Sequence, residues 1–406
     1  MRFLLTYLFV VAVALWSPGA PVAFAEDTSG LSADELNGES AILIDATTGQ
    51  VLFEKNPHER LYPASITKIA TGIYAIENGN PDDIVTVSKK ARYEEGTRVY
   101  LGEGEQVSLR KLEYGLLMHS GNDAATAIAE HMSQTTERFA EQLNAYLQEK
   151  VGVTETHFAN AHGLHDPNHY TTASDMAKIA RYAMTNPTFR EIVGTNRLPW
   201  NGREWKSELI NHNKLLRDYE GATGIKNGFT DQAMHTLVGS AKRGNTEFIA
   251  VTMKAAASAY AYKDVTKMLD YGFAHFETKQ VAPDGKAYTR AAVPGDANVI
   301  TYTTMDDLYA SVPKGTEPLI QLTDYGQLSV QAGNLTVTYP LLRHDPPTPP
   351  EDQKAIAAPS LKEHPAIGYG LLFVWLGLNL FMLLFTISRM RKMRRIRRRD
   401  LQRRAY

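Results

Sequence analysis

The sequence contains no cysteine, and this absence excludes several kinds of chemistry at once. None of its 406 residues can supply a thiol nucleophile, a disulfide or a thiolate ligand for zinc or an iron–sulfur cluster. Glycine (29 residues) and proline (19 residues) are too few for a collagen-like or low-complexity chain. A chain of this length can form two or three domains and bury one sizeable hydrophobic core. Because such a core stabilises the fold, we expect a folded protein that needs no disulfides.

The sequence also lacks a large excess of either charge, because its net charge is only −2. The charges are unevenly placed, however. Residues 389–406 hold ten Arg or Lys and one Asp, which leaves 33 basic against 44 acidic residues, a net charge of −11, in the rest of the chain. Nucleic-acid-binding proteins usually carry their positive charge on a face of a folded domain. A basic tail on an acidic body argues against nucleic-acid binding and suits a membrane protein.

Both ends of the chain predict a membrane location. Residues 1–25 are typical of a secretory signal peptide, with Arg2 before an uncharged apolar run and an Ala-Phe-Ala cleavage site; an uncleaved anchor helix is the alternative. Residues 366–388 carry no charge. A helix of that length reaches about 34 Å, enough to cross the ~30 Å hydrocarbon core of a membrane. A buried helix of a soluble domain is the alternative interpretation. The basic tail that follows marks the cytoplasmic side and can bind anionic lipid headgroups. We therefore expect a single-pass cell-membrane protein whose body is extracytoplasmic and whose tail, residues 389–406, is cytoplasmic.

The segment after the signal peptide begins with strand and helix patterns. Two β-prone runs, residues 40–45 and 50–54, predict a hairpin. Thr172 followed by Asp175 has the spacing of a capping box at a helix start. The stretches with a helical pattern are residues 65–77, 111–118, 123–131, 137–150 and 174–185.

Strand patterns return in the second half of this region. Residues 236–241 and 247–254 predict paired strands, and residues 263–276 predict a closing helix. Residues 40–276 are therefore expected to form a mixed α+β domain.

The pattern changes again after residue 276. Residues 277–342 predict a small all-β domain, because short β-prone runs alternate with Gly and Pro turns. Residues 343–365, rich in proline, predict a stiff, extended linker between this domain and the membrane. The β-prone runs are residues 299–303, 319–322, 327–330 and 335–339.

A candidate nucleophile opens the first predicted helix, in the motif Ser65-Ile66-Thr67-Lys68. Residues three apart share a helix face, so the Lys68 amine can reach the Ser65 hydroxyl. An uncharged lysine can serve as the base that activates a serine if its surroundings lower its pKa. By itself the pattern is weak evidence for a catalytic serine, because most S-x-x-K sequences lie on solvated surfaces.

Two further motifs follow at a distance. Ser120-Gly121-Asn122 offers a second hydroxyl and an amide, which can relay a proton and hold a substrate amide; a turn with an Asn cap explains it equally well. In residues 224–230, Lys226 stands before a glycine on an expected strand edge, where it can lie close to a substrate carboxylate. Each motif alone is weak evidence for a site.

The three motifs together, in this order, resemble those of the serine penicillin-binding and β-lactamase superfamily. Residues 40–52, 120–125 and 162–173 narrow the resemblance to the low-molecular-weight D-alanyl-D-alanine carboxypeptidases, peptidase family S11. This resemblance implies a transpeptidase-like α+β domain, with an antiparallel sheet and flanking helices, over residues 40–276. It extends to the β domain that follows, and the chain is expected to end in the transmembrane helix.

The resemblance also implies a reaction and a role for each motif residue. The reaction is removal of the terminal D-Ala from peptidoglycan stem peptides that end in D-Ala–D-Ala, without a cofactor, and β-lactam antibiotics would acylate the same serine. The implied catalytic residues are Ser65 as nucleophile, Lys68 as its base and Ser120 as proton relay. The implied substrate-binding residues lie around them. Asn122 holds a substrate amide, and Lys226 and Asn227 face the substrate carboxylate. The N–H of Phe229 forms the oxyanion hole with that of Ser65, and His162 lies at the edge of the site.

Two departures from the family pattern affect recognition of the substrate carboxylate. Asn227 stands where the family usually has Thr, and residues 258–263 contain no Arg, with Lys263 the nearest cation. Each charge-assisted contact contributes roughly 1.5–3 kcal/mol. Loss of such contacts would weaken recognition of a free carboxylate before it affected acylation, so D,D-endopeptidase activity on cross-links remains an alternative. A third departure is the anchor, which spans the membrane here where relatives often use an amphipathic helix.

Other functions remain open from the sequence. Residues 162–169 contain three His and one Asp, a set that could bind catalytic zinc without cysteine. A wall-binding scaffold that has lost turnover is a second alternative, which Asn227 favours and the complete set of motif residues disfavours. A β-lactamase is disfavoured because no additional base for activating water is evident.

Overall fold

A computed structural model describes residues 30–291 and 299–345 of the chain. The expected signal peptide (residues 1–25), the transmembrane helix (366–388), the basic tail (389–406) and most of the proline-rich linker lie outside the described residues. Among the residues that are described, no helix is long and apolar enough to cross a membrane.

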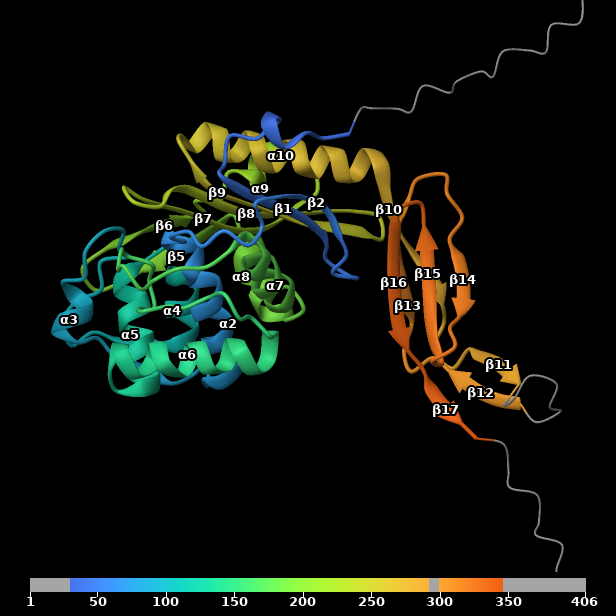
Figure 1. Ribbon diagram of the computed structural model, residues 1–406. Helices are drawn as coiled ribbons and strands as arrows, with labels where there is room; N and C mark the ends of the chain where they lie inside the picture. The colour runs from blue at the N-terminus through green and yellow to red at the C-terminus, as the bar shows by residue number, and fades with distance from the viewer. Residues whose placement is uncertain (1–29, 292–298, 346–406) are drawn as a thin grey trace, which may run out of the picture. The chain divides into compact units, whose positions relative to one another are not determined.

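The centre of the first domain is a five-stranded antiparallel sheet with the strand order β2-β1-β9-β8-β7 (Figure 1). The hairpin predicted near the start is confirmed, because β1 pairs with β2 and Gly49 takes a positive φ of 75° in the turn between them. The strand pair predicted at residues 236–254 is also confirmed, as β8 and β9. The bounds of the strands are β1 Ser40–Asp45, β2 Val51–Lys55, β7 Ala222–Thr230, β8 Met234–Arg243 and β9 Thr246–Ala255.

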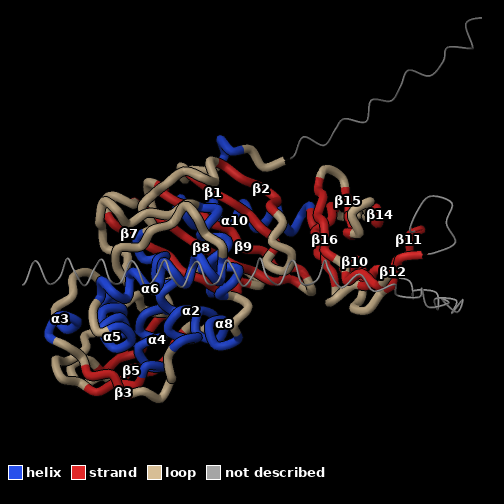
Figure 2. The backbone as a smooth tube through the Cα atoms, turned by 60° about the horizontal axis from the view of Figure 1, so that its bottom comes forward, coloured by secondary structure: helices blue, strands red, loops and turns tan. Residues whose placement is uncertain are grey.

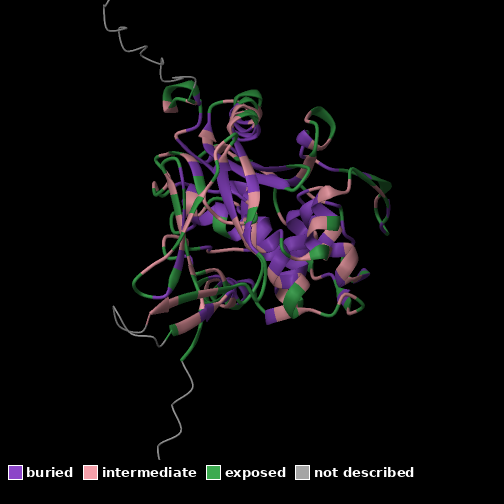
Figure 3. Cartoon of the chain, turned by 90° about the vertical axis from the view of Figure 1, so that its right-hand side faces the viewer, coloured by how far each residue is buried: buried purple, intermediate pink, exposed green. Residues whose placement is uncertain are grey.

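Both faces of this sheet are covered, which explains why β1 and β9 are buried along almost their whole length. Along β1, Ile42 and Ile44 belong to the core on the side of the helical layer, whereas Ala41 and Leu43 belong to the core under α10 (Ser258–His275). This alternation follows from the two-residue period of a strand. Figure 3 shows the buried residues concentrated along the strands and the helices next to them.

The helical layer packs on the face of the sheet opposite α10, and Figure 2 shows its helices (blue) gathered on one side of the strands (red). The helix start predicted at Thr172 is confirmed, because its side chain accepts the N–H of Asp175 at 3.1 Å. The Asp175 carboxylate, which would complete the predicted capping box, accepts from the N–H of Glu155 and the hydroxyl of Thr156 instead. The helices are α2 Lys68–Asn78, α3 Lys89–Arg92, α4 Leu109–Leu117, α5 Asn122–Ser133, α6 Thr136–Val151, α7 Ala173–Ala183 and α8 Pro187–Gly194, and the short α9 spans Leu215–Asp218.

Some elements differ from the sequence-based expectation. The helix expected over residues 65–77 begins as a 3₁₀ turn, η2 (Ala64–Thr67), and becomes α-helical only at Lys68. Helix α8 was not predicted, although Asn186 at its N-cap and Pro187 at its first position are typical start signals. The hairpins β3 (Ile84–Thr86) with β4 (Gln106–Ser108) and β5 (Arg197–Asn201) with β6 (Lys206–Ile210) were also missed, because strands of three to five residues are too short to show a clear alternation.

A small β domain follows the α+β domain, as the sequence predicted. Its core contains Val281, Val312, Leu328 and Val330. Four of its strands, β10, β11, β13 and β17, were not predicted individually. The strands are β10 Phe276–Ala282, β11 Ala287–Ala291, β12 Val299–Thr303, β13 Leu308–Pro313, β14 Leu319–Leu322, β15 Gln327–Ala332, β16 Leu335–Pro340 and β17 Leu342–His344.

Candidate active site

The turn that carries Ser65 has a strained backbone, which the side chains of Thr67 and His169 hold in place. Ala64, directly before the serine, is buried and has a positive φ of 50°. The Thr67 hydroxyl donates to the Ala64 carbonyl at 2.9 Å and lies 2.8 Å from His169 Nε2. His169 Nδ1 accepts the N–H of Ala159 at 3.0 Å, so its ring hydrogen lies on Nε2 and points at Thr67. Burial lowers the pKa of His169 to about 3, which keeps this support neutral.

The amine of Lys68 lies at the centre of the site, with three oxygen atoms around it. Lys68 Nζ is 3.0 Å from Ser65 Oγ, 2.7 Å from Asn122 Oδ1 and 2.5 Å from the carbonyl oxygen of His162. The amide oxygen and the carbonyl can only accept, so they take two N–H groups of the amine. In the neutral amine this leaves the lone pair for the Ser65 hydroxyl, which is the arrangement a base needs.

The environment of Lys68 favours that neutral form. The side chain is completely buried, and burial lowers its pKa well below the usual value. The positive charge of Lys226 lowers the pKa further, while the carboxylates of Asp123 and Glu94 act in the opposite direction.

The second motif lies where the chain enters α5. Ser120 is buried with a positive φ of 64°, and Asn122 is the first residue of the helix. Asn122 Nδ2 donates to the Glu95 carbonyl at 2.6 Å, which orients Oδ1 toward Lys68. One N–H of the amide therefore remains for another acceptor.

The third motif is on β7, at the edge of the sheet, and its backbone approaches Ser65 closely. A Cβ at Gly228 would lie 2.6 Å from the backbone nitrogen of Ser65, so glycine is required there. Lys226 is buried, and its Nζ donates to the Asn227 carbonyl at 2.9 Å and lies 3.4 Å from Asn227 Oδ1. Burial lowers the pKa of Lys226 to about 7. The Phe229 ring is 54% exposed and packs on His235, with ring centroids 4.5 Å apart.

His162 contributes more than the position at the edge that the resemblance implied. Its backbone carbonyl accepts from Lys68, while its ring Nδ1 accepts the N–H of Leu164 at 3.1 Å. Burial, and next the charge of Lys68, lower the pKa of His162 to about 3.

The histidines of residues 162–169, which could have bound zinc, have separate partners. The His165 ring packs edge-on against Tyr62, with centroids 4.7 Å apart, whereas His169 faces Thr67. Within residues 30–291 and 299–345, no three His, Asp or Glu side chains are grouped as metal ligands.

Thr67, Glu94 and His169 support the site in roles that were not predicted from the sequence, where His169 was considered only as a zinc ligand. The only signal for Thr67 and His169 is that they lie inside motif segments, and Glu94 has none. Residues 258–263, at the start of α10, contain no arginine, and Lys263 is exposed.

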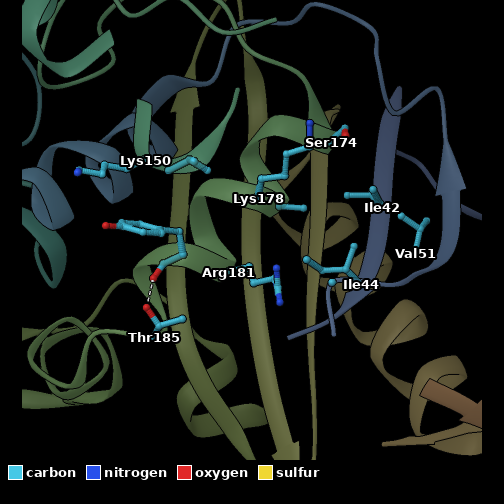
Figure 4. A pocket seen from close by; sticks show the side chains of 12 residues that line it. Ile42, Ile44, Val51, Lys150, Ser174, Lys178, Arg181 and Thr185 are labelled. Carbon is cyan, nitrogen blue, oxygen red and sulfur yellow. Dashed lines mark hydrogen bonds between the residues drawn. The ribbon is translucent and has the colours of Figure 1, made fainter. Parts of the chain in front are cut away.

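A cavity of about 300 Å³ lies away from these motifs, between β1, β2 and α7 (Figure 4). Its basic residues already have protein partners. Lys178 pairs with Asp175, Lys150 pairs with Glu149, and Arg181 donates to two backbone carbonyls of the β1–β2 turn. None of the motif residues lines this cavity, so it does not compete with the site around Ser65.

Comparisons with known proteins point to one family. The model of the peptidase S11 family, described as D-alanyl-D-alanine carboxypeptidase, matches residues 27–257. The D-alanyl-D-alanine carboxypeptidase DacF of Bacillus subtilis is 35% identical over 308 residues, which cover 73% of this chain and 78% of DacF. DacD of Escherichia coli is 32% identical over 329 residues, covering 77% of this chain and 83% of DacD. Penicillin binding protein 5 of Haemophilus influenzae has a similar structure, with a TM-score of 0.69 and 29% identity over 78% of this chain and 99% of that one.

Proposed function

Because this chain belongs to the peptidase S11 family and is a serine-type D-Ala-D-Ala carboxypeptidase, we propose that it trims the terminal D-Ala from peptidoglycan stem peptides through an acyl-enzyme on Ser65. The observation that carries the proposal is the contact of 3.0 Å between the buried Lys68 amine and the Ser65 hydroxyl. A fully buried lysine whose pKa is lowered is suited to accept the serine proton at neutral pH.

The chemistry that we propose starts from the contact between Ser65 and Lys68. Ser65 Oγ attacks the carbonyl carbon of the penultimate D-Ala while its proton passes to Lys68. The C–N bond then breaks, and the leaving D-Ala amine takes a proton that Ser120 relays from Lys68. A water molecule next adds to the ester carbonyl and gives its proton to Lys68, and the shortened peptide leaves as Ser65 regains its hydroxyl.

Binding of the substrate uses the groups around this pair. The N–H groups of Ser65 and Phe229 stabilise the negative charge on the carbonyl oxygen, since β7 lies against the serine turn. The free N–H of Asn122 binds a substrate amide oxygen. Lys226 and Asn227 face the terminal carboxylate, and penicillin binds in the same place and acylates Ser65.

Mass spectrometry of a muropeptide digest tests this function directly. We expect the purified protein to remove one D-Ala from pentapeptides, and we expect protein that has first been treated with penicillin to leave the digest unchanged. Cleavage of cross-linked dimers without trimming would instead support the endopeptidase alternative. An unchanged digest would support the scaffold.

The proposed location is the outer face of the cell membrane, with residues 366–388 as the anchor and residues 389–406 against the inner lipid surface. The support is the apolar, uncharged span and the basic tail behind a signal-like start. Alkaline extraction, which releases peripheral proteins, should leave the full chain in the membrane fraction and release a chain that ends at residue 345. Retention of the shorter chain would contradict the anchor.

A further inference from the structure

Glu94 places a carboxylate beside the site, although it belongs to none of the motifs. It lies in the loop after α3, and its side chain is 14% exposed. Its Oε2 accepts the hydroxyl of Thr126, on α5, at 2.7 Å and lies 3.8 Å from His162 Nε2. Thr126 therefore holds the carboxylate in a defined position next to the histidine.

His162 connects this carboxylate to Lys68. Its carbonyl accepts from the Lys68 amine at 2.5 Å, and its ring faces Glu94. Since His162 Nδ1 accepts the N–H of Leu164, the hydrogen of the neutral ring lies on Nε2 and points toward the carboxylate. At 3.8 Å the two groups are too far apart for a hydrogen bond, and the neutral ring brings no positive charge between Glu94 and Lys68.

The residues next to Glu94 contact the other partner of the amine. The Glu95 carbonyl accepts from Asn122 Nδ2 at 2.6 Å, and a Cβ at Gly96 would lie 2.8 Å from the same nitrogen. Residues 94–96 thus pack against the side chains of His162 and Asn122, the two residues that accept from Lys68, His162 through its backbone carbonyl and Asn122 through its side-chain Oδ1.

Three charged groups act on Lys68 from three elements: Lys226 from β7, Asp123 from α5 and Glu94 from the loop after α3. The Asp123 carboxylate is already used by the backbone, because it accepts the N–H groups of Val99 and Leu101 at 3.0 and 3.1 Å.

The basic side chains near Glu94 have partners of their own. Arg92 pairs with Glu204, and Lys90 contacts the side chains of Thr136 and Glu137. Of the two carboxylates that act on Lys68, Glu94 accepts one backbone N–H group, that of Glu95 at 3.3 Å, whereas Asp123 accepts three.

Acylation creates a positive charge in this buried place. When Lys68 takes the Ser65 proton, an ammonium forms next to Lys226, and repulsion and desolvation both oppose it. A carboxylate close by offsets these costs in the transition state as well as in the product of proton transfer.

We propose that Glu94 is a positioning residue that stabilises the protonated Lys68 formed when Ser65 is acylated, and that it acts across His162 without touching the substrate. This role rests on the proposed function of Ser65 and Lys68, and it adds a residue that the motifs do not contain.

The test is the second-order rate of labelling by a fluorescent penicillin, measured across pH on the full chain. Glu94→Gln removes the charge and nearly keeps the shape. We expect the labelling rate on its plateau to fall about tenfold. We also expect the acid limb of the profile to move to lower pH, because loss of a carboxylate lowers the pKa of Lys68 further. Thr126→Val removes the hydrogen bond that holds Glu94 and changes no charge. We expect it to lower the plateau rate and to move the acid limb to lower pH, each by less than Glu94→Gln does.

The control is Glu141→Gln, the same change at an exposed position on α6, which should match the unmodified protein. Thermal unfolding of each variant separates a folding defect from a change in the site. A Glu94→Gln profile with an unchanged acid limb, or one moved to higher pH, would overturn the role of Glu94. Labelling that persists in Ser65→Ala would instead overturn the proposed function itself, so the two failures are distinguishable.

Discussion

Lys68→Met is expected to slow the labelling of Ser65 by penicillin by a factor of about 10²–10⁴, the range that a positioned general base contributes. Lys68 Nζ is the amine 3.0 Å from the Ser65 hydroxyl, and methionine fills a similar volume without a lone pair of comparable basicity. The loss also removes the donor to Asn122 Oδ1, so orientation of that amide suffers as well.

Stopped-flow or gel-based labelling at several pH values measures this effect. Ser65→Ala, which removes the acylated atom, sets the zero of the assay. Lys178→Met, at a half-exposed lysine of α7 paired with Asp175, should label at the normal rate. If Lys68→Met kept more than a tenth of the rate, another group would have to be the base.

Gly163→Ala is expected to lower the labelling rate about 10²-fold, although this residue touches no reacting group. A Cβ at residue 163 would lie 2.0 Å from the carbonyl oxygen of Ala64 and 3.0 Å from Thr67 Oγ1, and Gly163 has a φ of 88°. Ala64 already has a strained backbone, so the turn has to move and Ser65 moves with it. A displacement of about 1 Å in such a site costs on the order of 10²-fold in rate.

The matched control is Gly152→Ala. Gly152 also has a positive φ, of 74°, but a Cβ there would meet no atom within 4 Å. Like Gly163→Ala, Gly152→Ala introduces backbone strain of roughly 1–2 kcal/mol, but it introduces no clash. We therefore expect its unfolding temperature to drop while its labelling rate per folded molecule stays normal. Equal labelling of folded Gly163→Ala and Gly152→Ala would show that the turn under Ser65 tolerates displacement.

Much of the fold was predictable because its signals are local. The β1–β2 hairpin follows from two apolar runs around a glycine turn, and the start of α7 follows from Thr172, which caps the N–H of Asp175. Helix α8 carried equally local signals in Asn186 and Pro187 and was overlooked. The short hairpins β3–β4 and β5–β6 have too few apolar residues for periodicity to show them.

The sequence by itself determined the chemical inventory and the family, because the three motifs consist of residue types whose order and spacing can be recognised without coordinates. Only the tertiary structure decided how that inventory works. The carbonyl of His162, the carboxylate of Glu94 and the approach of Gly228 to Ser65 involve backbone atoms or segments distant along the chain, which leave no signature in residue type. The lowered pKa of Lys68 likewise arises from burial and from the charge of a residue on another strand, and both exist only once the chain has folded.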